Sequence, residues 1–180
     1  NSAEALTAWF NPTINSYKRI NAPVTVSGAT WAPNTITYSG NNRTHMIRVP
    51  GPGRFELRLM DGATNPYLLQ AGIIAAGLDG LDKKRNPGKP INVNMYEDAH
   101  KVKGAKKLPL SLNQALNNLN KSKVLKSAFG KDVINSYITL KNREIKKYNS
   151  SKEKKIGFRK SKSNKSNLIT QWERDNTLDC

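Results

Sequence analysis

The sequence predicts an α+β domain in which antiparallel strands pack against a buried helix and are followed by a helical tail. Three observations support this class. Short β-prone runs occupy residues 11–62, an apolar run of helical length follows at 67–78, and helical periodicity dominates after residue 110. The chain has 180 residues, which is enough for one such domain and hardly enough for two.

Turn-forming residues divide the N-terminal part into short strands. Proline occurs in Asn11-Pro12, in Ala22-Pro23 and in the run PGPG at 50–53, where the backbone is expected to turn. Between these points, residues 24–26 (VTV) and 35–38 (TITY) are rich in β-branched side chains and predict strands.

The clearest strand is residues 54–59, RFELRL, where charged and apolar side chains alternate without exception. Because successive side chains of a strand point to opposite faces, Arg54, Glu56 and Arg58 are expected to share one face. The apolar side chains between them are expected to share the other.

A helix is predicted to begin after Asn65, which can cap it, with Pro66 at its first position. From about Tyr67 to Leu78 this helix has almost no polar face. A helix that is apolar nearly all round is typically buried, so we expect the sheet or other helices to cover it.

The tail is expected to consist of three helices. Ser111 can cap a short amphipathic helix, and a second short helix is expected from about Lys123 to Phe129, ending at Gly130. The apolar stripe of the first helix consists of Leu112, Leu116 and Leu119. The stripe of the third, longer helix consists of Val133, Ile134, Tyr137, Ile138 and Ile145.

Positive charge is concentrated in the second half of the chain. Thirty Lys and Arg residues against thirteen Asp and Glu give a net charge of +17, of which residues 1–80 contribute only +2. Residues 141–165 contain eleven Lys and Arg but two acidic residues. Such a Lys/Ser-rich tract is typically solvated and disordered. We therefore divide the chain into a domain at 1–146, an insertion at 147–167, and the C-terminal tail of the same domain at 168–180.

Several classes of protein are excluded by composition. The only cysteine is Cys180, so no disulfide framework and no cysteine-based metal site are expected. The longest charge-free apolar stretch, 66–78, is too short for a bilayer, which needs about 20 residues. No basic stretch followed by an apolar run opens the sequence, so we expect no secretory signal, and the first residue is Asn1 rather than Met, which suggests a fragment or a processed product. We expect a cytoplasmic protein that does not bind membranes.

Arginine dominates the positive charge of the first eighty residues, with one lysine beside it. The arginines are Arg19, Arg43, Arg48, Arg54 and Arg58. One interpretation is a solvated sheet face on which Glu56 pairs with a neighbouring arginine. The other is a site for an anionic substrate with a cation bound at Glu56, because the planar guanidinium binds carboxylate and phosphate in a bidentate manner. His45 has no second His or Cys nearby and is expected to be structural, and His100 to be solvated.

Four motifs, in the right order and spacing, resemble the glutamine synthetase family. They are NPTINSYKR at 11–19, NRTHMIRVP at 42–50, RFELR at 54–58, and NPYLLQAGIIAAGLDG at 65–80. The resemblance covers about residues 9–146 and resumes at 171–174. It identifies the chain as the C-terminal part of the family's catalytic domain.

The resemblance implies ATP-dependent ligation of ammonia to the γ-carboxylate of glutamate through an acyl phosphate, with Mg²⁺ or Mn²⁺. It implies that Glu56 is a metal ligand and that Arg19 and Arg58 bind glutamate. The same resemblance makes Arg43 and Arg58 catalytic, and it assigns the nucleotide to Arg43, Arg48 and Arg54. It further implies a homo-oligomeric ring. Tyr96 falls where some members carry an adenylylated tyrosine, although a structural tyrosine is the commoner fate.

Two departures from the family pattern matter. Most members follow the first motif with a longer loop that contains a glutamate and helps to deprotonate ammonium, but here residues 20–23 form a short loop with Asn21 and no carboxylate. A glutamate–amine ligase, for example one that uses methylamine, is therefore an alternative. Most of the family's metal ligands also precede this segment, so the segment alone is expected to be inactive.

A basic nucleic-acid-binding module is the rival interpretation, because a Lys-rich tract binds phosphate backbones non-specifically. Only Tyr148 and Phe158 lie within the tract, which lacks the aromatic platform of single-strand binders. We expect no specific nucleic-acid partner.

Overall fold

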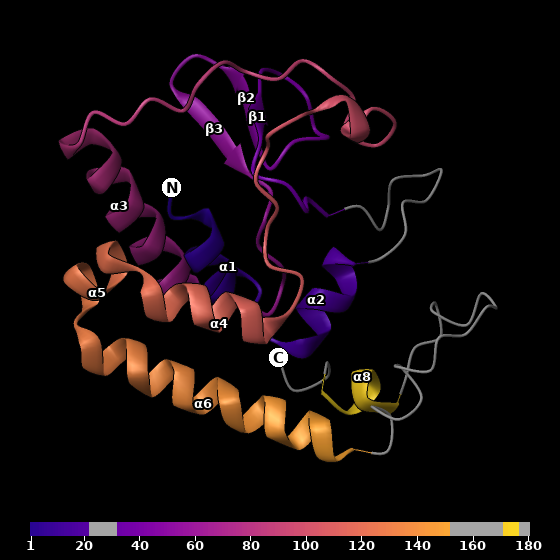
Figure 1. Ribbon diagram of the computed structural model, residues 1–180, viewed down its shortest axis with the longest axis vertical. Coiled ribbons are helices and arrows are strands. Elements are labelled where there is room, and N and C mark those ends of the chain that lie inside the picture. Colours follow the sequence, from indigo (N-terminus) through magenta and orange to yellow (C-terminus); the bar gives the residue numbers. More distant parts are fainter. Residues whose placement is uncertain (22–31, 152–170, 177–180) are drawn as a thin grey trace.

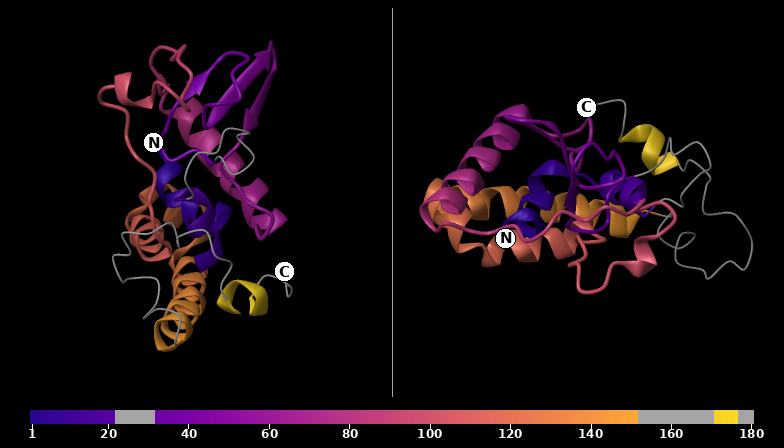
Figure 2. Two further views of the ribbon diagram at one scale, coloured as in Figure 1. Left: turned by 90° about the vertical axis from the view of Figure 1, so that its right-hand side faces the viewer. Right: turned by 90° about the horizontal axis from the view of Figure 1, so that it is seen from above.

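A computed structural model describes residues 1–21, 32–151 and 171–176, and it shows a small sheet at one end of the molecule and a group of helices at the other (Figure 1). The left view of Figure 2 shows the same separation of the sheet from the long helix α6. The predicted α+β class is confirmed. The predicted strand at 24–26 and most of the predicted insertion lie outside the described residues.

The helices are α1 (Ala3–Phe10), α2 (Ile14–Ile20), α3 (Pro66–Asp82), α4 (Leu112–Lys121), α5 (Lys123–Phe129), α6 (Lys131–Ser150) and α8 (Gln171–Asp175), with a 3₁₀ turn at Ala99–Lys101. The strands are β1 (Tyr38–Ser39), β2 (Ile47–Gly51) and β3 (Arg54–Leu57).

The sheet has the order β1-β2-β3. Strands β2 and β3 form an antiparallel hairpin in which Arg48 lies opposite Glu56. Gly53 has a φ of 72° in the connecting turn, a conformation that glycine adopts without steric cost. Among the described strands, the prediction of antiparallel pairing holds for β2 and β3 but not for β1, which runs parallel to β2. The apolar face of β3 is also less covered than expected, since Phe55 is exposed.

The core lies around α1, which the sequence pattern did not predict. Trp9 and Phe10 are both 1% exposed, and α1 packs against α3 and α4. The Trp9 ring meets the Phe129 ring edge-on at 5.0 Å. The Tyr137 hydroxyl donates to the Ala8 carbonyl at 2.6 Å, so α6 is tied to the same helix.

Helix α2 occupies residues that the turn pattern assigned to strands. The prediction was wrong because capping contacts outweigh the local β propensity. The Thr13 and Ser16 side chains and backbones bond reciprocally at its N-terminus. The backbone N–H of Ile14 also donates to Glu144 Oε1 of α6 at 2.9 Å, a contact that spans 130 residues.

The tail helices follow their predicted caps. The Ser111 side chain accepts from the Gln114 N–H at the start of α4, and α5 ends at Gly130, whose φ is 81°. In α6 the predicted stripe is only partly correct, because Ile134 is buried while Val133 is 47% exposed.

Helix α3 begins as predicted, since Asn65 Oδ1 accepts from the N–H of Tyr67 and of Leu68. The prediction that it is buried was wrong for this chain. Gly72 is its only buried residue, and the exposed fractions of Ile74 and Leu81 reach 61% and 75%. The physical reason is that α1 and α5 pack against one side of the helix and leave the opposite apolar side open.

The C-terminal end of the described chain returns to α6. Helix α6 runs to Ser150, past the boundary that we set at residue 146. Trp172 of α8 is buried and meets Tyr148 edge-on at 5.1 Å.

Candidate active site

The predicted site centres on an ion pair across the hairpin. Arg48 Nη1 lies 2.8 Å from both carboxylate oxygens of Glu56. The Arg48 side chain is 11% exposed and the Glu56 side chain 35%, so the pair is partly shielded from water. Arg48 is further held by Nε, which donates to Asn41 Oδ1 at 2.9 Å. The register of β2 and β3 thus fixes both partners.

Two more arginines lie near the same carboxylate. Arg54 Nη2 donates to Glu56 Oε1 at 3.2 Å. The hydrogen bond from Arg48 lowers the pKa of Glu56 below its ordinary value, and the charges of Arg54 and Arg43 act in the same direction. Three cations therefore surround one anion, which leaves an excess of positive charge suited to phosphate or carboxylate.

Arg19 lies at a different place, beyond the end of β3. Its Nη2 donates to Asn11 Oδ1 and to the Leu59 carbonyl, both at 2.8 Å. Asn11 Nδ2 also donates to the Leu59 carbonyl, at 3.1 Å. These bonds tie α2 to the chain that leaves β3. Burial lowers the pKa of Arg19, although the nearby charge of Asp61 opposes that shift.

Arg58 directly follows β3 and precedes the buried Leu59, so the chain connects the Glu56 cluster to the Arg19 anchor. Its backbone N–H donates to the Met46 carbonyl at 2.8 Å. The structure therefore gathers Arg43, Arg48 and Arg54 around Glu56. Arg58 lies one residue from the carbonyl that Arg19 binds.

The donor set around Glu56 does not by itself form a metal site. A divalent cation of this type is held by several oxygen ligands, and both Glu56 oxygens already accept from Arg48. No group of three or more His, Cys, Asp or Glu side chains that could hold a metal occurs in residues 1–21, 32–151 and 171–176. Glu56 could contribute one ligand at most.

The loop that carries Arg43 contains polar residues that sequence reasoning did not assign to the site. Asn42 Oδ1 accepts from the Thr44 N–H at 2.9 Å and from the Thr44 hydroxyl at 2.7 Å, which closes a turn with Arg43 at its tip. His45 is fully buried, as expected of a structural histidine. Its Nε2 lies 3.0 Å from the Val93 carbonyl. The two asparagines at 41–42 are the feature of the sequence from which this turn could have been predicted.

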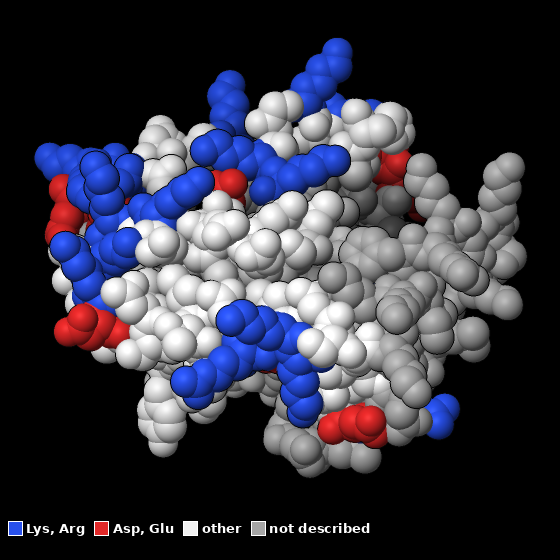
Figure 3. Space-filling view, turned by 60° about the horizontal axis from the view of Figure 1, so that its bottom comes forward, with Lys and Arg blue, Asp and Glu red and all other residues white. Residues whose placement is uncertain are grey.

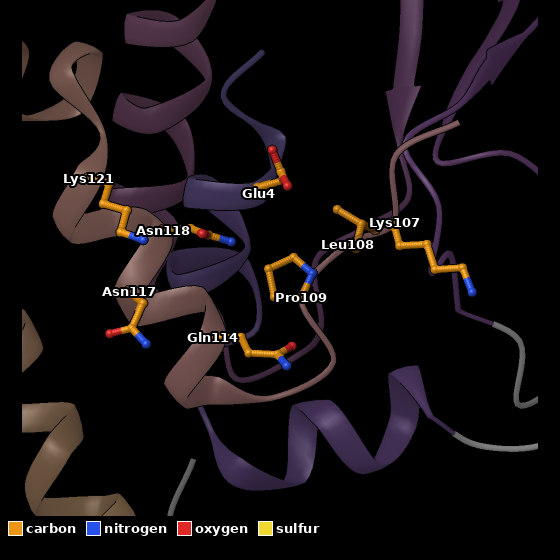
Figure 4. Close-up of a pocket in the computed structure, with 8 residues that line it drawn as sticks. All are labelled: Glu4, Lys107, Leu108, Pro109, Gln114, Asn117, Asn118 and Lys121. Carbon is orange, nitrogen blue, oxygen red and sulfur yellow. The ribbon is translucent and has the colours of Figure 1, made fainter. Parts of the chain in front are cut away.

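Two hollows of the described surface do not coincide with these residues. One of about 370 Å³ lies between α1, α4 and residues 107–109 and is lined mostly by polar side chains such as Gln114 and Asn117 (Figure 4). A smaller one of about 170 Å³ lies beside Thr44 and Tyr96. Neither is lined by a predicted site residue. The chemistry of the arginines and Glu56, rather than a concave shape, marks the candidate site.

In the described part of the chain, no helix has both the length and the apolar composition needed to cross a bilayer.

Comparison with known proteins identifies the family. Residues 1–158 match the family described as glutamine synthetase, catalytic domain. A glutamine synthetase of Rhizobium meliloti is 54% identical over 177 residues, which are 98% of this chain and 37% of that protein. A glutamate–methylamine ligase of Methyloversatilis universalis is 47% identical over 149 residues, which are 81% of this chain and 33% of that protein.

The fold agrees with this match. A solved structure described as a GmaS/ADP complex is similar with a TM-score of 0.76 and 49% identity, and the similarity covers 99% of this chain and 37% of that one. The chain thus spans about a third of the length of these relatives. Together with the Arg48–Glu56 hairpin and the motifs around it, these matches show that the chain belongs to the glutamine synthetase family and is a part of its catalytic domain.

Proposed function

We propose that the protein carrying this segment is a glutamine synthetase, which joins ammonia to the γ-carboxylate of glutamate at the expense of ATP through an acyl phosphate. The observation that carries the proposal is the cluster of Arg43, Arg48 and Arg54 around Glu56. Fixed guanidinium groups stabilise the negative charge of a transferring phosphoryl group, and they do so best where the protein holds them in advance.

Each predicted site residue has a role in this proposal. Arg43 and Arg58 stabilise the phosphoryl group, and Arg48 and Arg54 bind the nucleotide phosphates. Arg19 and Arg58 bind the glutamate. For Arg19 the partly buried bonds to Asn11 and Leu59 support a positioning part as well, because they join its helix to the segment that carries Arg58.

Mg²⁺ or Mn²⁺ would neutralise phosphate charge when bound. Glu56 would supply one ligand, and the remaining ligands would come from the rest of the catalytic domain. Arg48 must then release one carboxylate oxygen, since it bonds both in this structure. Homo-oligomerisation is proposed on family membership alone.

A glutamate–amine ligase is the second candidate. The 47% identity to a glutamate–methylamine ligase favours it, and so does the sequence after the first motif, where residues 20–23 contain no carboxylate. The two candidates share the arginine cluster and differ only in the amine that attacks.

Phosphate release by the full-length protein with glutamate, ATP and Mg²⁺ tests both candidates when ammonia and methylamine are compared. Arg58→Ala should lower kcat/KM by about 10²- to 10³-fold, as the loss of a charge-stabilising donor typically does. Arg143→Ala on the exposed part of α6 is the matched control and should retain activity.

Turnover with ammonia supports the glutamine synthetase, and turnover with methylamine alone supports the amine ligase. Turnover with neither amine, or full activity in Arg58→Ala, contradicts the proposal.

A further inference from the structure

Residues 91–95 run beside β1 and the loop at 40–45, which carries Arg43. The Ile91 N–H donates to the Tyr38 carbonyl at 3.0 Å, and the Ser39 hydroxyl lies 3.0 Å from Asn92 Oδ1. These contacts place the segment along the edge of the sheet, some fifty residues away from the loop in sequence.

Three further bonds join the segment to the loop itself. The Val93 carbonyl accepts from Asn42 Nδ2 and lies equally close, at 3.0 Å, to His45 Nε2. The Met95 N–H donates to the Thr44 hydroxyl at 2.9 Å. Arg43 is therefore flanked on both sides by residues that are fastened to the same segment.

His45 is the buried member of this group. A carbonyl oxygen only accepts hydrogen bonds, so the bond to Val93 requires a proton on Nε2. Nδ1 is buried and has no hydrogen-bond partner among the described residues, which favours the neutral ring. With two donors, the Val93 carbonyl has both lone pairs occupied.

The guanidinium of Arg43 has no hydrogen-bond partner among the residues that the structure describes, and the side chain is exposed. Its position therefore depends on its backbone, which is held by its neighbours rather than by its own contacts. A group that must meet a reacting phosphoryl oxygen loses much of its effect when it is displaced by about 1 Å.

We propose that residues 91–95 form a clamp that holds Arg43 in its working position and that His45 is the positioning residue of this clamp. The proposal rests on the proposed function for the role of Arg43. The clamp itself rests only on the bonds from Asn42, Thr44 and His45 to Val93 and Met95.

A double-mutant cycle in the full-length protein tests the coupling. His45→Ala should lower kcat/KM by about ten- to a hundredfold, in line with the cost of a misplaced catalytic group. His45→Gln should restore much of the loss, since its amide can donate to the same carbonyl. In an Arg43→Ala background, His45→Ala should change kcat/KM by less than about twofold, because the residue that it positions is gone. His100→Ala, at an exposed position, is the matched control and should have no effect.

Hydrogen exchange at the Thr44 and Met95 amides gives a readout that does not depend on turnover. His45→Ala should accelerate exchange at both, while exchange in α4 stays unchanged. Should His45→Ala fail to fold, two variants of Thr44 replace it. Thr44→Val removes the hydroxyl that accepts from the Met95 N–H, and Thr44→Ser keeps it.

An equal loss of kcat/KM from His45→Ala with and without Arg43 overturns the proposal, and so does unaltered exchange at Met95. If the unmodified protein turns over neither amine, the proposed function fails. The clamp is then decided by the exchange measurement alone.

Discussion

At Glu56 a single carboxylate is shared between structure and chemistry. In this chain it accepts hydrogen bonds from Arg48 and Arg54, as expected of an acidic residue that forms a structural ion pair on a sheet face. A structural ion pair needs one arginine beside the carboxylate, whereas Glu56 has three nearby. Arg43 lowers the pKa of Glu56 without bonding to any described residue, and this spare cation is the feature that points to an anionic ligand.

The buried histidine predicts how stability depends on pH. Burial lowers the pKa of His45 below its ordinary value of 6.5. At pH values between the pKa of His45 in the folded protein and 6.5, His45 is therefore protonated in the unfolded chain and neutral in the folded chain. The free energy of unfolding is therefore not reduced by His45 above this pH range, and it falls as the pH drops through the range.

Thermal unfolding of the full-length protein at pH 7.5 and 5.5 measures this effect. His45→Gln should show a smaller loss of Tm on acidification than the unmodified protein, because the glutamine does not titrate. The exposed His100→Gln should behave like the unmodified protein. An unchanged pH response in His45→Gln would refute the assignment.

At the scale of the elements, α3 packs closely against α1 at Gly72, which has no side chain. A Cβ added at Gly72 would lie 2.8 Å from Leu6 Cδ2 and 3.1 Å from the Trp9 ring. Leu6 could rotate away, but the Trp9 ring is packed against Phe129 and has little room to move. Gly77 in the same helix has nothing within 4 Å of such an atom.

Gly72→Ala should therefore destabilise the protein by about 1–3 kcal/mol, as overpacking of a core typically does. Gly77→Ala should instead be neutral or stabilise by up to about 1 kcal/mol, since alanine is the better helix former. Urea unfolding of the two variants gives the comparison directly. Equal effects at both positions would show that the α1–α3 contact is looser than described.

Local signals predicted some elements and failed for others. The caps at Asn65 and Ser111 and the stop at Gly130 were readable because each acts on its own neighbours within three or four residues. Helix α2 was missed although its capping box at Thr13 and Ser16 is local, and only the further bond from Ile14 to Glu144 comes from another helix. The parallel pairing of β1 was equally hidden, since a two-residue strand has no pattern of its own.

The same division applies to the candidate site. The alternation at 54–58 correctly predicted that Arg54 and Glu56 share a face, and Arg54 bonds to Glu56. It did not predict that Arg48 lies opposite Glu56, because that position depends on the register of the hairpin. The role of Val93 could not be predicted from the sequence. Its backbone carbonyl, not its side chain, is the group that His45 and Asn42 contact, and every residue has such a carbonyl.

At the scale of the whole molecule, the open side of α3 is the main sign that more of the domain is required. A single apolar helix face with Tyr67 82% and Leu81 75% exposed is costly in water. The chain spans 37% of its 54%-identical relative. We expect the remainder of the catalytic domain to cover this face in the full-length protein.

The segment of residues 1–180 alone should therefore show no ATP-dependent phosphate release and should bind a hydrophobic dye such as ANS strongly. The full-length protein, assayed in parallel, should bind little dye and should turn over. Measurable turnover by the isolated segment would contradict our expectation that the other metal ligands and the nucleotide cradle lie outside it.

Charge on the helical end does not form a continuous coat. In Figure 3, which brings this end forward, Lys and Arg side chains form separate groups with neutral surface between them. A nucleic-acid module would favour an unbroken basic stripe. The described surface on this side therefore gives the rival interpretation little support. Residues 152–165 of the basic tract lie outside the described residues.

The bond between Ile14 and Glu144 also has a consequence for biosynthesis. The start of α2 is completed by a carboxylate that the ribosome adds 130 residues later. At a typical rate of 5–20 residues per second, that delay is about 6–26 s. During this interval the helix that presents Arg19 lacks its final cap, and Trp9 lacks its partners on α5 and α6. A nascent chain of this kind would offer chaperones the apolar side chains of α1 until α6 emerges.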